Sequence, residues 1–99
     1  MKTIDPNTKT TRRTFGLGRT VATPSALAEI DAEDISTALS RHVECDWGEC
    51  GTEDWRENDF ALHNDLRLFS VYQDQNDVKF WIITEADRSS TTILLPGDY

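Results

Sequence analysis

The chain has 99 residues, of which 37% are hydrophobic and 28% charged, and acidic side chains outnumber basic ones 18 to 10. This length is typical of a single domain. The sequence contains no apolar run near the ~20 residues that a membrane span needs, and residues 1–14 lack the apolar core of a secretory signal. Two cysteines are too few for a disulfide framework. We therefore expect a small, soluble, cytoplasmic domain that does not contact membranes.

The charge is distributed unevenly along the chain. Residues 1–20 carry five basic and one acidic side chain, a net charge of +4, whereas residues 21–99 carry five basic and 17 acidic side chains, a net charge of −12. Residues 44–65 alone hold eight acids against Arg56, a net charge of −7. Such a field repels phosphate and attracts basic partner surfaces. We therefore expect the folded body not to bind nucleic acid directly, and the basic N-terminal arm stays an alternative route to nucleic acid.

The start of the chain predicts a tail, a short strand and a short helix. Residues 1–14 are polar with little to bury, which indicates a disordered basic tail before a single domain over residues 15–99. The alternating pattern of residues 15–22 predicts a strand, and its two glycines favour a sheet edge. Thr23 as N-cap and Pro24 at the first helical position then predict a short helix over residues 25–30.

A longer helix is predicted after Asp31, and it is the strongest helical pattern in the chain. One helical face is marked by residues at the required spacing, namely Ile35, Ala38, Leu39, His42 and Val43. A loop with two glycines follows over residues 45–51. Thr52 is a candidate cap for an acidic helix over residues 53–62, which would bury Trp55 and Leu62.

The last third of the chain is rich in β-branched and aromatic residues. Three strands are predicted, over residues 66–72, 78–84 and 91–95, with turn-like segments between them. Because the connections are short, the strands should form an antiparallel meander. The fold class is therefore α+β, with an N-terminal short strand and two or three helices packed on a C-terminal three- to four-stranded antiparallel sheet. Phe80, Ile82 and Thr84 should face one side of this sheet, and Trp81 and Ile83 the other.

Two sets of side chains are candidates for chemistry, and the residue pattern favours neither. A histidine–cysteine array has a spacing within the range of zinc ligands, and its members are His42, Cys45, Cys50 and His63. His42, however, lies on an apolar helix face, where a packed and hydrogen-bonded histidine is commoner than a ligand. Glu85 and Asp87 with a histidine could form an acid–base pair, but acids in a tight turn are ordinarily solvated or cap a backbone amide. We therefore predict no metal, no cofactor and no catalytic residues.

The Asp46-Trp47-Gly48 segment follows the long helix and places an aromatic residue between acids. Its default interpretation is structural, since an aromatic residue beside a glycine can fold back and staple a helix end. The functional alternative is an acidic, aromatic surface for a partner, because tryptophan is a favoured interface anchor. The candidate partner-binding residues are Asp46, Trp47, Glu49, Glu53, Asp54, Trp55, Glu57 and Asp59.

Two segments of the chain carry a family resemblance. The first includes Arg41-His42, Asp46-Trp47-Gly48, Glu53-Asp54 and Asn58, and the second runs from Trp81 to Pro96. Over residues 15–99 the chain resembles a family of small uncharacterised bacterial proteins described as plasmid-related. The resemblance implies a setting on plasmids or integrated mobile elements, but it brings no known activity or catalytic residues. Cys45 stands where the family pattern has glycine, which makes this cysteine look incidental and further weakens the zinc interpretation.

Three functional hypotheses follow from the charge pattern and the resemblance. The first is a non-enzymatic accessory protein of a mobile genetic element that binds a basic protein partner through residues 44–65, and could thereby inhibit a host defence complex by mimicry of nucleic acid. The second is a regulatory module, monomeric or homodimeric, that binds nucleic acid through the basic arm. The third is a small metal-dependent hydrolase or nuclease that uses Glu85, Asp87 and a histidine.

Overall fold

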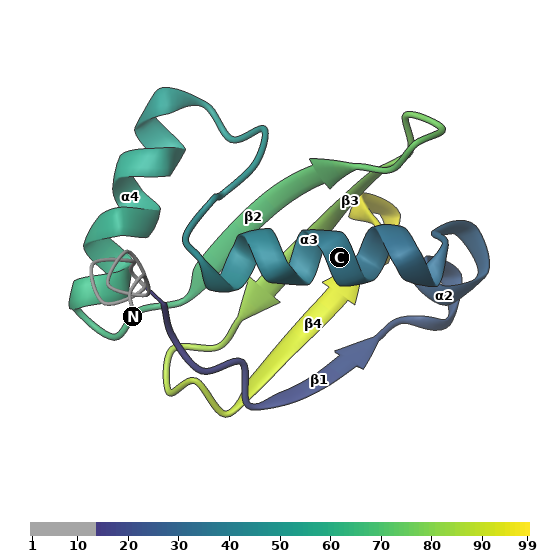
Figure 1. The fold of residues 1–99 in the computed structure, drawn as a ribbon. Coiled ribbons are helices and arrows are strands. Elements are labelled where there is room, and N and C mark those ends of the chain that lie inside the picture. Colours follow the sequence, from purple (N-terminus) through teal and green to yellow (C-terminus); the bar gives the residue numbers. More distant parts are fainter. Residues whose placement is uncertain (1–13) are drawn as a thin grey trace, which may run out of the picture.

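The structure of the chain is a computed structural model that describes residues 14–99 (Figure 1). The tail predicted over residues 1–14 lies outside the described residues, apart from Thr14. The described chain contains, in order, β1 (Arg19–Ala22), α2 (Pro24–Glu29), α3 (Ala32–Val43), α4 (Thr52–His63), β2 (Leu68–Gln73), β3 (Lys79–Thr84), β4 (Ser90–Leu94) and a 3₁₀ turn, η1 (Pro96–Asp98).

The strands form one four-stranded sheet in the order β1-β4-β3-β2. As predicted, β2, β3 and β4 form an antiparallel meander, and β1 lies at an edge. The predicted α+β fold is confirmed, with the addition that the sheet is mixed because β1 runs parallel to β4, with Thr20 beside Thr91. Strand β2 starts two residues later than predicted, because Leu66 lies in the turn after α4, where its N–H donates back to Ala61 O at 3.0 Å.

Local sequence signals explain where the helices begin. The side chain of Thr23 accepts a hydrogen bond from the backbone N–H of Ala26 at 3.2 Å, which caps α2 as predicted. Helix α3 opens with acids in its first turn, where they complement the helix dipole. The predicted cap of α4 is wrong by one residue, because Gly51 is the N-cap and Thr52 is already helical.

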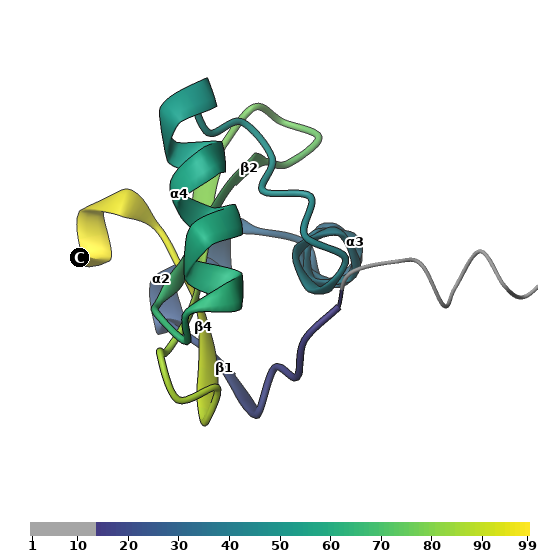
Figure 2. The same cartoon turned by 90° about the vertical axis from the view of Figure 1, so that its left-hand side faces the viewer.

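The main core lies on the sheet face covered by α3, with α2 closing one end (Figure 1). Phe80 and Ile82 point into it from β3, and Ala38 of α3 packs against them. Figure 2 shows α3 end-on at one side of the sheet, with α4 standing beside the edge formed by β2. The prediction that helices pack on one face therefore holds for α2 and α3, whereas α4 covers an edge. Among residues 14–99, no helix is long and apolar enough to cross a membrane.

The opposite face of the sheet carries aromatic residues under a thinner cover. Trp81 points to this side, as predicted, and its ring lies 4.8 Å from that of Phe69 and 5.8 Å from that of Tyr99, centroid to centroid. Tyr99 follows η1 and is 74% exposed. Among residues 14–99, no helix packs across this face as α3 does across the other, and the C-terminal turn supplies part of its cover.

Candidate functional site

Helix α4 carries the densest group of exposed acids among the predicted partner-binding residues. Glu53 and Asp54 lie in its first turn, where they also stabilise the helix dipole, and Glu57 follows one turn later. All three side chains are exposed, as is that of Glu49 in the preceding loop. Within residues 14–99, no hydrogen bond or ion pair joins Glu53, Asp54 or Glu57 through its side chain to a neighbour. We call Glu49, Glu53, Asp54 and Glu57 the acidic surface.

Trp47 does not belong to this surface, and its predicted role as a partner anchor is wrong. Its side chain is fully buried, with the ring stacked 6.1 Å from that of Phe15 and edge-on to His42. The indole Nε1–H donates to Asp59 Oδ1 at 3.0 Å, which ties the loop to α4. Burying an indole with its N–H satisfied is a stable arrangement. Trp47 therefore has the structural role that was its default interpretation.

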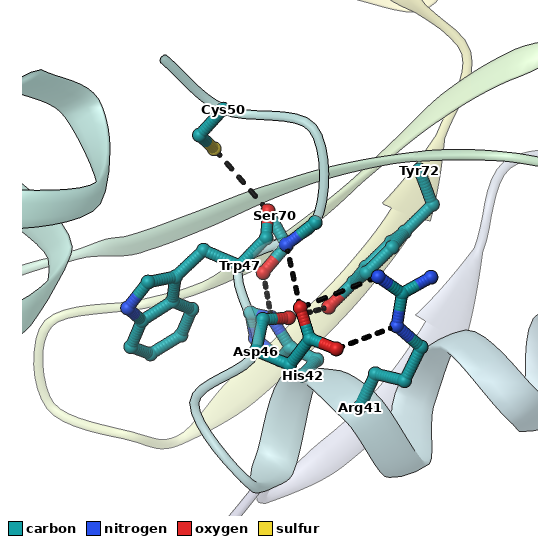
Figure 3. Close-up of polar contacts among 8 residues, drawn as sticks. Arg41, His42, Asp46, Trp47, Cys50, Ser70 and Tyr72 are labelled. Carbon is teal, nitrogen blue, oxygen red and sulfur yellow. Dashed lines mark hydrogen bonds and ion pairs between the residues drawn. The ribbon is translucent and has the colours of Figure 1, made fainter. Parts of the chain in front are cut away.

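The other predicted partner residues are less exposed than the acidic surface. Trp55 and Asp59 are half-buried, and Trp55 packs against the small cluster around Trp47. Asp46 accepts hydrogen bonds from Arg41 Nε at 2.8 Å and Nη2 at 3.3 Å (Figure 3). This hydrogen bonding lowers the pKa of Asp46 and keeps its carboxylate charged. Asp46 is therefore engaged within the chain at the end of α3.

The loop after Asp46 covers the outer edge of β2. Val71 N–H donates to Trp47 O at 3.1 Å, and Glu49 N–H donates to Val71 O at 2.7 Å, so the loop adds a short parallel bridge. Gly48 has a φ of 78°, and a β-carbon there would overlap the Val71 carbonyl oxygen and the Tyr72 ring. Only glycine fits so close an approach.

Asn58 of α4 completes this cover. Its side-chain amide donates to Phe69 O at 2.7 Å and its carbonyl oxygen accepts from Phe69 N–H at 2.9 Å. Asn58 thus makes with one side chain the two hydrogen bonds that a neighbouring strand would make. Because Asn58 is only 5% exposed and an unpaired amide is costly to bury, both hydrogen bonds are needed. We call the segment Trp47–Glu49 together with Asn58 the edge cover, because it satisfies the outward backbone groups of Phe69 and Val71.

His42 is buried in a hydrogen-bonded chain. Thr91 Oγ1 donates its one hydrogen to Leu17 O at 2.7 Å. In its 2.8 Å contact with Thr84 Oγ1 it must therefore be the acceptor. Thr84 Oγ1 must then accept from His42 Nε2 at 2.9 Å, which leaves Nδ1 to accept from Ser70 Oγ at 2.6 Å. Desolvation, assisted by the charge of Arg88, lowers the pKa of His42 to about 3. The imidazole is therefore neutral and closed to substrates, as the packed-histidine interpretation predicted.

The remaining candidates for chemistry are also engaged elsewhere or dispersed. Glu85 pairs with Arg67 at 3.4 Å, and Asp87 accepts from Ser89 N–H at 3.0 Å, which caps the β3–β4 turn. Cys50 Sγ lies 3.3 Å from Trp47 O, and burial raises the pKa of its thiol. In the part of the chain that the structure describes, no group of three or more His, Cys, Asp or Glu residues is placed to hold a metal ion.

A groove that the sequence does not predict lies between the free flank of α4 and β2. It encloses about 570 Å³ and is lined by Asp54, Glu57, Asn58, Phe60, Ala61, Leu66, Arg67 and Phe69. Phe60 is 62% exposed and Leu66 47% exposed. One sequence signal was present, because at about 100° per residue Phe60 lies roughly 140° around the helix from Trp55 and cannot share its buried stripe. The opposing wall from β2 has no local signal.

No protein-family model, no curated protein and no solved structure matches this chain.

Proposed function

We propose that this chain is a non-enzymatic accessory protein that binds a basic protein partner through the acidic surface. The observation that carries this proposal is the set of exposed carboxylates at the start of α4, which form no ion pairs within the described residues. Carboxylates held on a helix keep a fixed spacing, so a basic partner meets an ordered array of charges. Such an array speeds encounter with a basic surface and selects against acidic ones.

The partner we favour is a nucleic-acid-binding complex of host defence. Carboxylates can occupy the places that phosphates would take on a protein's basic face, which is the physical basis of nucleic-acid mimicry. The net charge of −8 is compatible with this role. The resemblance to plasmid-related bacterial proteins supports a mobile-genetic-element setting, in which an inhibitor of such a complex would be useful to the element.

The test compares two charge reversals that are matched in position. Glu53→Lys with Asp54→Lys reverses two acids in the first turn of α4, whereas Glu33→Lys with Asp34→Lys reverses two in the first turn of α3. Both pairs change the charge by the same amount and disturb a helix dipole equally, and the α3 pair additionally loses the hydrogen bond that Asp34 Oδ2 accepts from Gln75 N–H at 3.3 Å. Full-length tagged protein is used to capture partners from a bacterial host lysate at low and high salt, followed by mass spectrometry.

We expect a basic protein that is captured by the wild type and by the α3 variant, and that is lost with the α4 variant or at high salt. Equal capture by both variants would contradict the proposal. Salt-sensitive capture of nucleic acid that depends on Lys2, Lys9, Arg12 and Arg13 would instead favour binding through the basic arm.

A further inference from the structure

The groove beside α4 is lined by part of the exposed apolar surface of the described residues. Within residues 14–99, five large apolar residues are exposed, and two of them, Phe60 and Leu66, line the groove. A third, Tyr99, borders a smaller hollow of about 190 Å³ over the sheet face opposite α3, and Arg67 lines both. Clustered exposure of this kind on a small domain marks an interaction site more often than scattered exposure does.

The two walls of the groove differ in charge. Asp54 and Glu57 stand on the α4 wall without an ion-pair partner among the described residues. On the other wall, Arg67 is already held by Glu85 at 3.4 Å and by the Tyr99 hydroxyl at 3.3 Å. The groove therefore offers a neutralised cation, an apolar floor that includes Phe69, and two free carboxylates on one side.

We infer that this groove binds a peptide segment of the partner that presents a large apolar side chain flanked by Lys or Arg. The apolar side chain would pack between Phe60 and Phe69, and the cations would face Asp54 and Glu57. This inference rests on the proposed function and adds a contact that salt does not screen. A second copy of the chain is a poor occupant, because each copy has a net charge of −8 and would bring acids to an acidic wall.

The experiment uses two synthetic peptides with equal charge, KKLLKKLLKK and KKAAKKAAKK. Each is titrated into the full-length, isotope-labelled protein at low and high salt, and amide chemical shifts report both the affinity and the site. We expect the leucine peptide to bind about tenfold more tightly than the alanine peptide and to retain more of its affinity at high salt. The amides of Phe60, Leu66 and Phe69 should shift with the leucine peptide.

Two variants with equally exposed side chains provide the control. Phe60→Ser should reduce the affinity for the leucine peptide to that for the alanine peptide, whereas Leu27→Ser on α2, where the side chain is 64% exposed, should leave it unchanged. Equal binding of both peptides, with amide shifts in the acidic surface but none at Phe60, Leu66 or Phe69, would overturn the inference about the groove and leave the proposed function standing. Failure of both peptides to bind at low salt would contradict the proposed function itself.

Two further outcomes would overturn the inference by giving the groove another occupant. Concentration-dependent broadening of the Phe60 and Leu66 amides without peptide would identify a second copy of the chain. Shifts of the same amides when Arg12→Gln and Arg13→Gln are introduced into the full-length chain would identify residues 1–13 as the occupant.

Discussion

The two flanks of α4 are built on different principles. The inner flank carries two side chains of the helix that hydrogen-bond to other elements: Asn58 bonds to Phe69 of β2, and Asp59 accepts from the Trp47 indole. The outer flank presents Asp54, Glu57 and Phe60 to a groove and forms no such network. One helix thus closes a sheet edge with one side and leaves a concave apolar surface beside the other.

This contrast separates residues that specify the fold from residues that remain free for recognition. Trp47, Gly48 and Asn58 give the chain its most distinctive local pattern, and each has a structural contact that requires its residue type. Exposed edge strands are hazards, and covering β2 removes one. The distinctive local pattern therefore specifies the fold, whereas the candidate recognition surface consists of commoner residue types.

The largest effect is expected where the edge cover is tightest. Gly48→Ala should destabilise the protein by about 3 kcal/mol or more, because the new β-carbon would overlap Val71 O at a positive φ. Gly16→Ala is the control, since nothing lies within 4 Å of a β-carbon there, and it should stay within about 0.5 kcal/mol. Urea unfolding measures both free energies. Equal midpoints for the wild type and Gly48→Ala would contradict the described approach of the loop to β2.

Removing the amide of Asn58 should have the next largest effect. Asn58→Ala leaves the N–H of Phe69 without its partner and its C=O with only the Cys50 thiol at 3.5 Å, at a cost of about 2–3 kcal/mol. Asn64→Ala removes an exposed hydrogen bond to Phe60 O and should cost about 0.5 kcal/mol. Hydrogen exchange at the Phe69 amide should accelerate only in the first variant. If the two variants unfold at the same urea concentration, the edge cover is not a stabilising element.

Buried His42, which packs edge-on against Trp47, should make stability depend on pH. Desolvation lowers its pKa from 6.5 to about 3, so below pH 6.5 the unfolded chain binds a proton that the folded chain excludes. Stability should therefore be fully present above pH 6.5 and fall by about 1.5 kcal/mol between pH 6.5 and 5, continuing towards pH 3.

The measurement is urea unfolding at several pH values in that window. His42→Gln should flatten the pH dependence, and His63→Gln, which removes an exposed imidazole, is the matched control. An unchanged slope in His42→Gln would mean that another group carries the effect.

The sequence predicts those features that local patterns encode. The face marked by Ile35 and His42 predicts α3 because the spacing of one helix lies within the helix itself. Strand β1 runs parallel to β4, which places Thr20 beside Thr91. No local pattern specifies a pairing between residues so far apart in the sequence. Strand order in a mixed sheet therefore needs tertiary information.

The candidate site divides in the same way. Glu53, Asp54 and Glu57 on α4 are exposed, as their charge indicates. The environment of Trp47, in contrast, depends on Phe15 and Asp59, which only the fold brings together. An aromatic residue between acids is compatible with both an exposed anchor and a buried staple. Which of the two it becomes depends on the residues that contact it in the fold. Only the α4 wall of the groove could be predicted, because Phe60 lies off the buried stripe of that helix. The other wall could not, because Phe69 faces Phe60 only where β2 packs against α4.

The smallest effect on folding is expected on the outer flank. Phe60→Ala should change the free energy of unfolding by no more than about 0.5 kcal/mol, because the side chain is 62% exposed and alanine is the better helix former. Phe80→Ala, where the ring is 1% exposed, should cost about 3–5 kcal/mol in the same urea assay. A loss above about 1.5 kcal/mol at Phe60 would make the groove part of the folding core. If Phe60 is dispensable for folding, its exposed ring lowers solubility without adding to stability. Binding is then the physical reason for an aromatic ring at this position, between the carboxylates of α4 and an apolar wall.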